Sequence, residues 1–348
     1  MAIPQDDVQA AGKLREAYEA IHSQLHRVIV GQEQVIEELL IALFCRGHCI
    51  ITGVPGLAKT LMVSSLAKTL SLSFNRIQFT PDLMPSDITG TEIIQENKST
   101  GQRELVFVKG PVFANVVLAD EINRTPPKTQ AALLESMQEY QVTSGGTRYV
   151  VEKPFFVLAT QNPIEQEGTY PLPEAQLDRF MFNIMIDYPS EAEEFEIMVR
   201  TTADEFQEPE TVLGSDEIAN LQELVRRVPI SEHLIRYTME LVRITRRTGE
   251  NAPDVLRDTL AWGAGPRATQ FMILGAKARA LLKGRYAVAG EDVRAMAHPV
   301  LRHRLITTFT AEAEGVTSDM IVDKILKAVP PSKSETLSDG KLPQVFES

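Results

Sequence analysis

The chain of 348 residues has few cysteines, no long apolar run and fewer basic than acidic side chains. Cys45 and Cys49 are its two cysteines, so disulfides cannot define the fold, and a reducing cytoplasm is the compartment that we expect. The longest apolar stretches, such as residues 39–44, are far shorter than the ~20 residues of a membrane-spanning helix. The N-terminus is neither basic nor apolar, so we expect no signal peptide.

The deficit of basic side chains limits which partners the chain can bind. There are 35 Lys and Arg residues against 47 Asp and Glu residues, so the formal net charge is −12. Sequence-independent binding of nucleic acid depends on clustered positive charge, and we therefore do not expect nucleic acid as a partner. One basic cluster stands out, which we interpret as solvated helix faces or ion pairs. It consists of Lys277, Arg279, Lys283, Arg285, Arg294, Arg302 and Arg304.

The overall composition is that of a folded globular protein. Hydrophobic residues make up 43% of the chain and charged residues 24%, close to the usual values, and the length suits two domains. In the first half, short apolar runs alternate with helical periodicity, which is typical of an α/β fold with a parallel sheet. Three of these runs are almost continuously apolar, as in strands that are buried on both faces. We expect strands at residues 49–52, 76–80, 116–120 and 155–160, and helices at about 32–46 and 59–70.

Two hairpins are expected within this first half. The tip of the first is the polar segment 96–102, and the second turns at Gly145-Gly146, where glycine supplies the positive φ of a tight turn. The four expected strands are residues 92–95, 104–108, 140–143 and 148–151.

Beyond residue 188 the pattern changes to helices only. Ser190 and Glu193 form a capping box that opens the first of them. The final residues are poor in apolar side chains, as in an unstructured tail. The further helices expected are 216–227, 231–247, 267–283 and 290–304. The domains expected are an α/β domain at 1–188, a small helical domain at 189–330 and a disordered tail at 331–348.

The strongest local motif is Gly53-Val54-Pro55-Gly56-Leu57-Ala58-Lys59-Thr60, between an expected buried strand and an expected helix. In that context a glycine-rich loop binds phosphates through its backbone N–H groups and the helix N-terminus. Lys59 would reach the β- and γ-phosphates of ATP, Thr60 would coordinate Mg²⁺, and Leu61 continues the binding segment. Ala58 replaces the usual glycine, and its methyl group would be strained if this position requires positive φ.

Two carboxylates, Asp120 and Glu121, follow the apolar run 116–119. The end of such a strand lies beside the phosphate site of an open α/β sheet. Asp120 would coordinate Mg²⁺ through water, and Glu121 would orient or deprotonate the attacking water. With Lys59, these residues predict Mg²⁺-dependent ATP hydrolysis.

Other sites have weaker support. Cys45 and Cys49 with His48 offer three metal ligands across a turn, but two buried cysteines are the simpler interpretation. The six histidines show no spacing that indicates a metal site. No serine has His and Asp partners that the sequence can place, and no G-x-G-x-x-G follows a strand. We therefore do not expect a serine hydrolase or a dinucleotide-dependent oxidoreductase.

The order of the motifs resembles that of the AAA+ ATPases and, within them, of the MoxR family. The resemblance covers roughly residues 25–310, and the phosphate loop with Ala58 is similar to the form found in this family. It implies that segment 28–32, with Gly31 and Gln32, contacts the adenine base. The other similar segments are 118–124 (Walker B), 159–163 (sensor 1), 168–180 (the run most typical of MoxR proteins) and 265–268 (sensor 2).

The resemblance also implies roles for three residues outside the phosphate loop. Asn162 would position the attacking water together with Glu121. Arg179 is similar to the arginine finger, which stabilises charge on the γ-phosphate in a neighbouring subunit. Arg267 is similar to the sensor 2 arginine and would move from the helical lid onto the nucleotide. The two hairpins resemble inserts that project towards the central pore of a ring.

The expected fold is thus a P-loop AAA+ core, with a parallel sheet flanked by helices, followed by a small all-α C-terminal lid. The resemblance implies a hexameric ring that uses ATP and Mg²⁺ for the remodelling or chaperone-like maturation of partner proteins, including proteins with a von Willebrand factor A domain. Three alternatives stay open: a DNA-directed AAA+ remodeller, a metal-chelatase-type motor subunit, and a nucleotide-controlled scaffold with little turnover.

Overall fold

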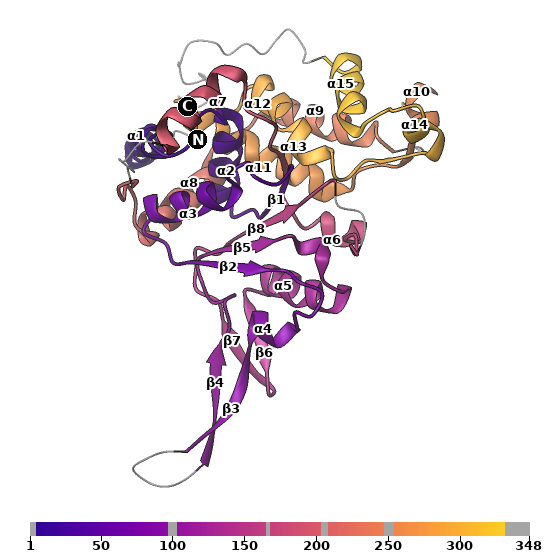
Figure 1. Ribbon diagram of the computed structural model, residues 1–348. Helices are drawn as coiled ribbons and strands as arrows, with labels where there is room; N and C mark the ends of the chain where they lie inside the picture. Colours follow the sequence, from indigo (N-terminus) through magenta and orange to yellow (C-terminus); the bar gives the residue numbers. More distant parts are fainter. Residues whose placement is uncertain (1–4, 97–102, 165–167, 203–207, 247–253, 331–348) are drawn as a thin grey trace.

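The computed structural model describes residues 5–96, 103–164, 168–202, 208–246 and 254–330 and contains a parallel sheet between two layers (Figure 1). Five strands form the sheet in the order β2-β5-β8-β1-β9, and all neighbouring strands are parallel. The expected α/β fold with a parallel sheet is therefore confirmed. The strands are β1 Cys49–Thr52, β2 Phe74–Gln78, β5 Val116–Asp120, β8 Phe156–Gln161 and β9 Phe182–Met185.

Both faces of the sheet are buried. Ile50 of β1 and Val117 of β5 pack into the core on one face, whereas the next residues, Ile51 and Leu118, pack into the core on the other. Strands covered on both sides have no polar alternation, which explains the continuous apolar runs in the sequence. Strand β9 was not expected, because Asn183 interrupts its apolar pattern. In the structure, Asn183 Oδ1 accepts a hydrogen bond from Thr52 Oγ1 at 2.9 Å.

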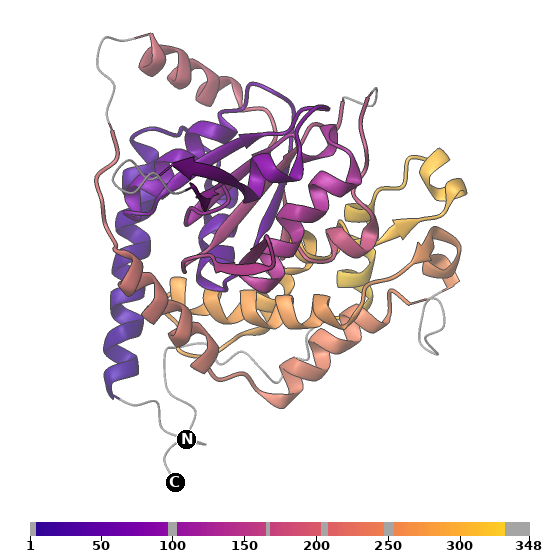
Figure 2. The ribbon, with the colours of Figure 1, turned by 90° about the horizontal axis from the view of Figure 1, so that it is seen from below.

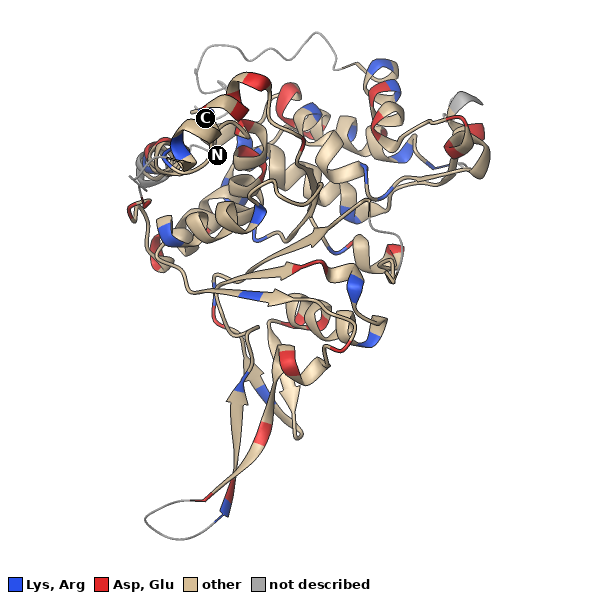
Figure 3. Ribbon diagram, in the orientation of Figure 1, with Lys and Arg blue, Asp and Glu red and all other residues tan. Residues whose placement is uncertain are grey.

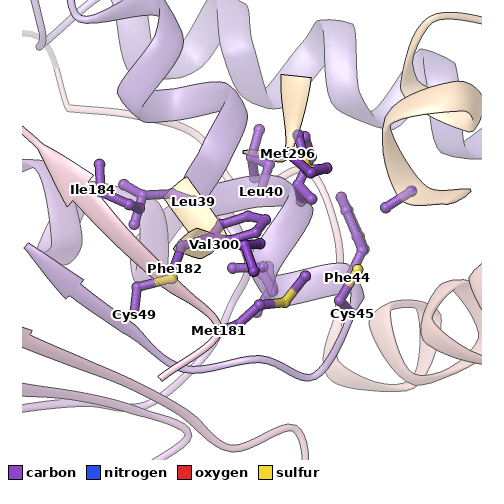
Figure 4. Packing of buried hydrophobic residues seen from close by; sticks show 14 of the residues in the cluster. Leu39, Leu40, Phe44, Cys45, Cys49, Met181, Phe182, Ile184, Met296 and Val300 are labelled. Carbon is purple, nitrogen blue, oxygen red and sulfur yellow. The ribbon is translucent and has the colours of Figure 1, made fainter. Parts of the chain in front are cut away.

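The larger helical layer covers the face that carries Ile51 and Leu118. Helices from both ends of the chain share its core with the sheet, and Figure 4 shows this packing around Phe44, Phe182 and Val300. Figure 2 shows α1 along one side of the layer, with α11 extending from it across the molecule. Helix α1 was not expected. The helices of this layer include α1 Gln5–His26, α2 Glu33–Phe44, α3 Lys59–Thr69, α8 Ser215–Arg227, α11 Pro266–Leu282 and α13 Ala297–Leu301.

The opposite face is covered by α4 (Pro85–Thr89), α5 (Pro127–Glu139) and the β6–β7 hairpin. Both expected hairpins are confirmed. Gly145 and Gly146 have the expected positive φ, 55° and 82°. Figure 1 shows the β3–β4 hairpin projecting away from the body of the molecule. The tip residues 97–102 lie outside the described part of the chain. The strands are β3 Gly90–Glu96, β4 Arg103–Lys109, β6 Gln141–Ser144 and β7 Thr147–Val150.

The region beyond residue 188 is mainly helical, but the expectation of helices only is wrong. Strand β10 (Leu260–Trp262) pairs antiparallel with β11 (Ile306–Thr307), and both are too short to produce a period of two in the sequence. The single helix expected at 290–304 is divided into α12 (Gly290–Ala295) and α13 (Ala297–Leu301). Pro299 lies inside α13 and has no N–H to donate to the Ala295 carbonyl, so the helix is interrupted one turn earlier, at Met296.

Helix α7 begins as expected at its capping box, in which Ser190 Oγ accepts a hydrogen bond from the Glu193 N–H at 3.4 Å. The domain division near residue 188 stays a prediction, and the expected tail at 331–348 lies outside the described residues. Within the described ranges, no helix is long and apolar enough to cross a membrane. The remaining helices are η1 Ile122–Arg124, α6 Glu174–Leu177, α7 Glu191–Thr201, α9 Glu232–Arg243, α10 Asp254–Thr259, α12 Gly290–Ala295, α14 Phe309–Ala313 and α15 Ser318–Ala328.

Candidate active site

The phosphate loop, residues 53–58, connects the carboxyl end of β1 to the first residue of α3, Lys59. Lys59 Nζ donates a hydrogen bond to the Gly53 carbonyl oxygen at 2.5 Å, so the ammonium group lies over its own loop. Burial lowers the pKa of Lys59, whereas the carboxylates of Asp120 and Glu121 act in the opposite direction. The loop lysine and the carboxylate pair therefore share one electrostatic environment.

Ala58, which replaces the usual glycine of the loop, has a left-handed backbone conformation. This is the conformation in which its methyl group is strained. Its φ is 52° and its ψ is 23°, and it directly precedes α3 as the N-cap residue. Gly56 also has positive φ, 86°, and a Cβ built there would meet no atom within 4 Å. The space over Gly56 is open, which suits a loop that receives phosphate groups.

The other predicted residues of this segment lie along the loop and the first turn of α3. Pro55 is exposed and Val54 half-buried. Leu57 and Leu61 pack against the main core and anchor the two ends of the turn, while Thr60 is half-buried on α3.

Asp120 ends β5 at the same edge of the sheet. Its Oδ1 accepts a hydrogen bond from Thr160 Oγ1 of β8 at 2.6 Å. Its Oδ2 accepts two bonds from Arg76 of β2, from Nε at 3.0 Å and Nη2 at 2.6 Å. The carboxylate is therefore held from both neighbouring strands.

Glu121 follows Asp120 with a left-handed backbone, φ 58° and ψ 48°. Its N–H donates to Thr160 Oγ1 at 2.8 Å, and its Oε2 accepts from Gln78 Nε2 at 2.7 Å. Arg124 Nε lies 3.3 Å from the same carboxylate oxygen. A non-glycine residue in this conformation is strained, and such strain persists where the surrounding contacts determine it.

Sequence reasoning missed Arg76, Gln78 and Thr160, which orient the two carboxylates. Arg76 and Gln78 are two residues apart on β2, so their side chains share one face, and Gln78 pairs with Asp120 in the register. One signal in the sequence was available. Polar residues stand at alternate positions near the end of β2, the strand that neighbours the carboxylate strand β5.

Asn162 and the Gly31-Gln32 segment lie at the same edge. Asn162 directly follows β8, the strand between β5 and β1, and its Oδ1 accepts a hydrogen bond from the Ile164 N–H at 3.1 Å. Gln32 Nε2 donates to the carbonyl of Asp187, just beyond β9, at 3.1 Å. Gly31 has φ 65°, which disfavours a residue with a Cβ, and a Cβ there would lie 2.0 Å from Glu193 Oε1 of α7, so a larger residue would have to displace the Glu193 carboxylate.

The structure does not bring Arg179 and Arg267 to this edge. Arg179 lies three residues before β9, and Arg267 pairs with the adjacent Asp178, so both are near the amino end of β9. There the Met181 N–H donates to the His48 carbonyl, just before β1, at 2.7 Å. Arg179 Nη1 donates to the Leu134 carbonyl of α5 at 3.3 Å. Arg267 Nη1 pairs with Asp178 Oδ2 at 2.8 Å. The strands are parallel, so these arginines are at the opposite edge of the sheet from the phosphate loop.

The basic cluster of residues 277–304 is engaged within the chain. Arg285 pairs with Asp292 and Glu291, Lys283 pairs with Glu37, and Arg302 pairs with Asp319. The other four members donate to carboxylates, a hydroxyl or backbone carbonyls. Figure 3 shows basic and acidic residues interspersed over these helices. The arrangement agrees with the ion-pair interpretation.

Known proteins similar to this chain cover most of its length. The family described as "ATPase family associated with various cellular activities (AAA)" matches residues 48–182, and the "AAA lid domain" matches residues 255–325. Chaperone MoxR1 of Mycobacterium tuberculosis is 43% identical, over 88% of this chain and 80% of its own. Protein MoxR of Paracoccus denitrificans is 32% identical, over 81% and 86%. A solved structure from Cytophaga hutchinsonii is 44% identical, has a TM-score of 0.86, and the match covers 93% of this chain and 98% of that one.

Proposed function

The chain belongs to the MoxR family of AAA+ ATPases and hydrolyses ATP, and we propose that it uses Mg²⁺-dependent hydrolysis to remodel partner proteins. The observation that carries the proposal is the convergence of Lys59, Asp120 and Glu121 at one edge of the sheet. A cationic loop lysine, an oriented carboxylate and a second carboxylate beside it are the groups that phosphoryl transfer to water requires. Each is held by contacts from a neighbouring strand or from its own loop.

The residues fit ATP and Mg²⁺. The ammonium of Lys59 rests on a carbonyl of its own loop and is available to phosphate oxygens, and the space over Gly56 is open. Thr60 and Asp120 would supply the hard oxygen ligands that Mg²⁺ prefers. When bound, the ion would offset the negative charge of the phosphates. Arg76 must then share or release the Asp120 carboxylate that it now binds.

Glu121 is the group that would orient the attacking water and accept its proton. Gln78 donates to one Glu121 oxygen and fixes the direction of the carboxylate, and Asn162 would hold the water from the other side. Gly31 and Gln32 would line the adenine site near the end of β9.

We further infer that Arg179 and Arg267 serve the nucleotide of a neighbouring subunit. Their position at the edge opposite the phosphate loop supports this role for both, and it changes the role expected for Arg267. A ring in which each protomer presents this edge to the next would complete every site with two arginines. The hexamer and the cytoplasmic location stay predictions.

Client proteins would contact the β3–β4 hairpin. Ile94 is 70% exposed and Leu105 is 69% exposed, and the two residues face each other in the hairpin register. Exposed apolar side chains grouped on one projection are typical of a surface that binds other proteins. Proteins with a von Willebrand factor A domain are the clients that we propose to test first.

A DNA-directed role has less support, because the basic cluster is paired within the chain. The described residues show no feature that favours a chelatase motor over a protein remodeller. The scaffold alternative predicts nucleotide binding without turnover.

Phosphate release by the purified chain, with and without Mg²⁺, tests the proposal. The wild type should release phosphate only with Mg²⁺, whereas Glu121→Gln should retain ATP and release almost none. Co-purification with the Glu121→Gln variant then identifies clients. Release by Glu121→Gln at the wild-type rate would remove Glu121 from its proposed role, and binding without turnover by the wild type would favour the scaffold.

A further inference from the structure

The end of α1 and the start of α2 bring two imidazoles and a carboxylate together. His22 Nε2 lies 2.6 Å from Glu33 Oε2, and His26 Nε2 lies 3.0 Å from Glu33 Oε1. The two Nε2 atoms are 3.2 Å apart. Among the described residues, this is the one group of three His, Cys, Asp or Glu side chains whose ligand atoms are close enough to share a metal ion.

The sequence produces this group through helix geometry. His22 and His26 are four residues apart on α1, so their rings lie on one face of the helix. Glu33 is the first residue of α2, and Gln32, the N-cap, has a left-handed backbone and makes no side-chain cap. The short connection 27–32 thus turns back through Gly31 and Gln32 and directs Glu33 towards α1. The expectation that the histidines lack metal spacing overlooked this four-residue interval, because the third ligand comes from another helix.

We propose that His22, His26 and Glu33 bind one divalent transition-metal ion of the Zn²⁺ class. Two imidazole nitrogens and one carboxylate oxygen are a common ligand set of Zn²⁺, with water in the remaining position. Neighbouring ligand atoms around a tetrahedral Zn²⁺ ion are about 3.3 Å apart. The 3.2 Å between the two Nε2 atoms matches this spacing, whereas the 2.6 Å between His22 Nε2 and Glu33 Oε2 would have to lengthen when the ion binds. The His22 and His26 side chains are 27% and 25% exposed, so an ion can enter without unfolding either helix.

The competing interpretation is a hydrogen-bonded triad without metal. One proton between each imidazole and Glu33 would account for the two shorter distances. In that arrangement the two Nε2–H groups lie side by side, with their nitrogens 3.2 Å apart, and each donates to Glu33 alone. A metal ion accepts lone pairs from both rings at once, so it satisfies both nitrogens in the same geometry.

The site would connect the two ends of the segment that precedes α2. His26 and Glu33 enclose residues 27–32, which contain Gly31 and Gln32. A bound ion would restrict this connection and fix Gln32, whose side chain already donates to the Asp187 carbonyl. This consequence rests on the proposed function, because Gly31 and Gln32 are there assigned to the adenine base. We expect the metal to strengthen ATP binding, since the segment would be ordered in advance.

Metal binding is tested first on the nucleotide-free full chain, stripped with EDTA and titrated with ZnCl₂ in Mg²⁺-free buffer. We expect one Zn²⁺ per chain, and affinity reduced more than ~100-fold in His22→Asn, His26→Asn and Glu33→Gln. His233→Asn changes an exposed histidine on α9 and should bind Zn²⁺ like the wild type. CoCl₂ replaces ZnCl₂ in a second titration, which should give visible absorption bands of a four-coordinate ion.

Thermal unfolding of the wild type is a second test of metal binding, and it does not depend on whether the variants fold. The unfolding midpoint should rise with ZnCl₂ and return after EDTA, because the ion binds the folded chain alone. No saturable binding, or equal binding by the wild type and the three variants, would overturn the site and favour the hydrogen-bonded triad.

ATP binding is measured separately, with a fluorescent ATP analogue and with Zn²⁺ or EDTA present. We expect several-fold tighter binding with Zn²⁺ in the wild type and no such change in His22→Asn. If Zn²⁺ binds but nucleotide affinity is unchanged, the proposed effect of the metal on ATP binding is wrong, whereas the metal site itself is supported. If the analogue does not bind under either condition, the proposed function fails independently of the metal result.

Discussion

Ala58 and Glu121 have left-handed backbones, which cost free energy in residues that carry a Cβ. Both flank the space that we assign to the phosphates of ATP, one before α3 and one after β5. Each is held there by its surroundings: Ala58 by the turn into α3, and Glu121 by the Thr160 hydroxyl and Gln78.

The strain at Ala58 can be measured. Ala58→Gly should raise the free energy of unfolding by about 1 kcal/mol, because glycine adopts positive φ without a steric penalty. Ala67→Gly is the matched control in the buried interior of α3, where the same substitution should lower stability. Urea unfolding of both variants checks the prediction. Equal destabilisation by the two changes would show that the conformation of Ala58 carries no strain.

Glu38 gives a residue-scale prediction on pH. Burial raises its pKa from 4.5 to about 7. Between these values the carboxyl is ionised in the unfolded chain but protonated in the folded one, so its contribution to stability falls by about 3 kcal/mol as pH rises. The loss is complete above pH ~7.

Glu38→Gln removes this titration. It should stabilise the protein at about pH 8 and change it little at about pH 4, as measured by urea unfolding at both values. A difference between variant and wild type that does not grow with pH would contradict the raised pKa.

The residues of the site differ in how far sequence could predict them. Lys59, Asp120 and Glu121 follow from motifs, because their roles depend on position next to a strand end. Arg76 and Thr160 act through a hydrogen bond to a carboxylate on another strand. Their roles depend on strand order, which sequence does not contain.

At the scale of elements, Asp178 connects the sheet to the C-terminal helices. Arg304 donates to Asp178 Oδ1 from Nε at 2.8 Å, and Arg267 pairs with Oδ2. The Arg304 side chain is 2% exposed, and burial lowers its pKa to about 10. The segment that carries Arg179 is therefore fixed by a buried arginine from beyond α13.

Asp178→Asn should destabilise the protein by about 3 kcal/mol, because it leaves the buried charge of Arg304 without its carboxylate. Arg267→Ala removes the exposed partner of the same carboxylate and should cost less than about 1 kcal/mol. Chemical unfolding distinguishes them. Similar losses of stability in the two variants would mean that the buried charge of Arg304 does not need the Asp178 carboxylate.

Element prediction failed where the pattern was short or the partner distant. The four residues of β9 include a polar Asn183, and β10 and β11 are shorter still. The strands β1, β5 and β8 were predictable because they are buried on both faces and carry few polar residues.

At the scale of the whole molecule, the proposed catalytic groups and the exposed apolar hairpin occupy different parts of the structure. The β3–β4 hairpin projects from the body (Figure 1), and an aromatic pair, Phe107 and Tyr149, stacks at 3.9 Å and joins it to the β6–β7 hairpin. The two hairpins therefore form one connected projection.

Replacing Ile94 and Leu105 with serine should abolish capture of clients by the Glu121→Gln chain, because the paired apolar side chains provide the contact. The thermal midpoint should hardly change, since both side chains are exposed. Thr91→Ser on the same hairpin is the control. Capture is detected by co-purification. If the double variant captures clients as well as the parent chain does, the clients bind to another surface.

Glu121 and Arg179 lie at opposite edges of the sheet. The central claim is therefore that one subunit supplies Glu121 to an ATP site and its neighbour supplies Arg179. The claim is tested by phosphate release from Glu121→Gln and Arg179→Ala chains, assayed separately and after co-expression. Each variant alone should be nearly inactive. A mixed ring should regain about a quarter of wild-type activity, because a site works when an Arg179→Ala subunit meets the arginine of a Glu121→Gln neighbour. Mixed rings no more active than either variant alone would contradict the account.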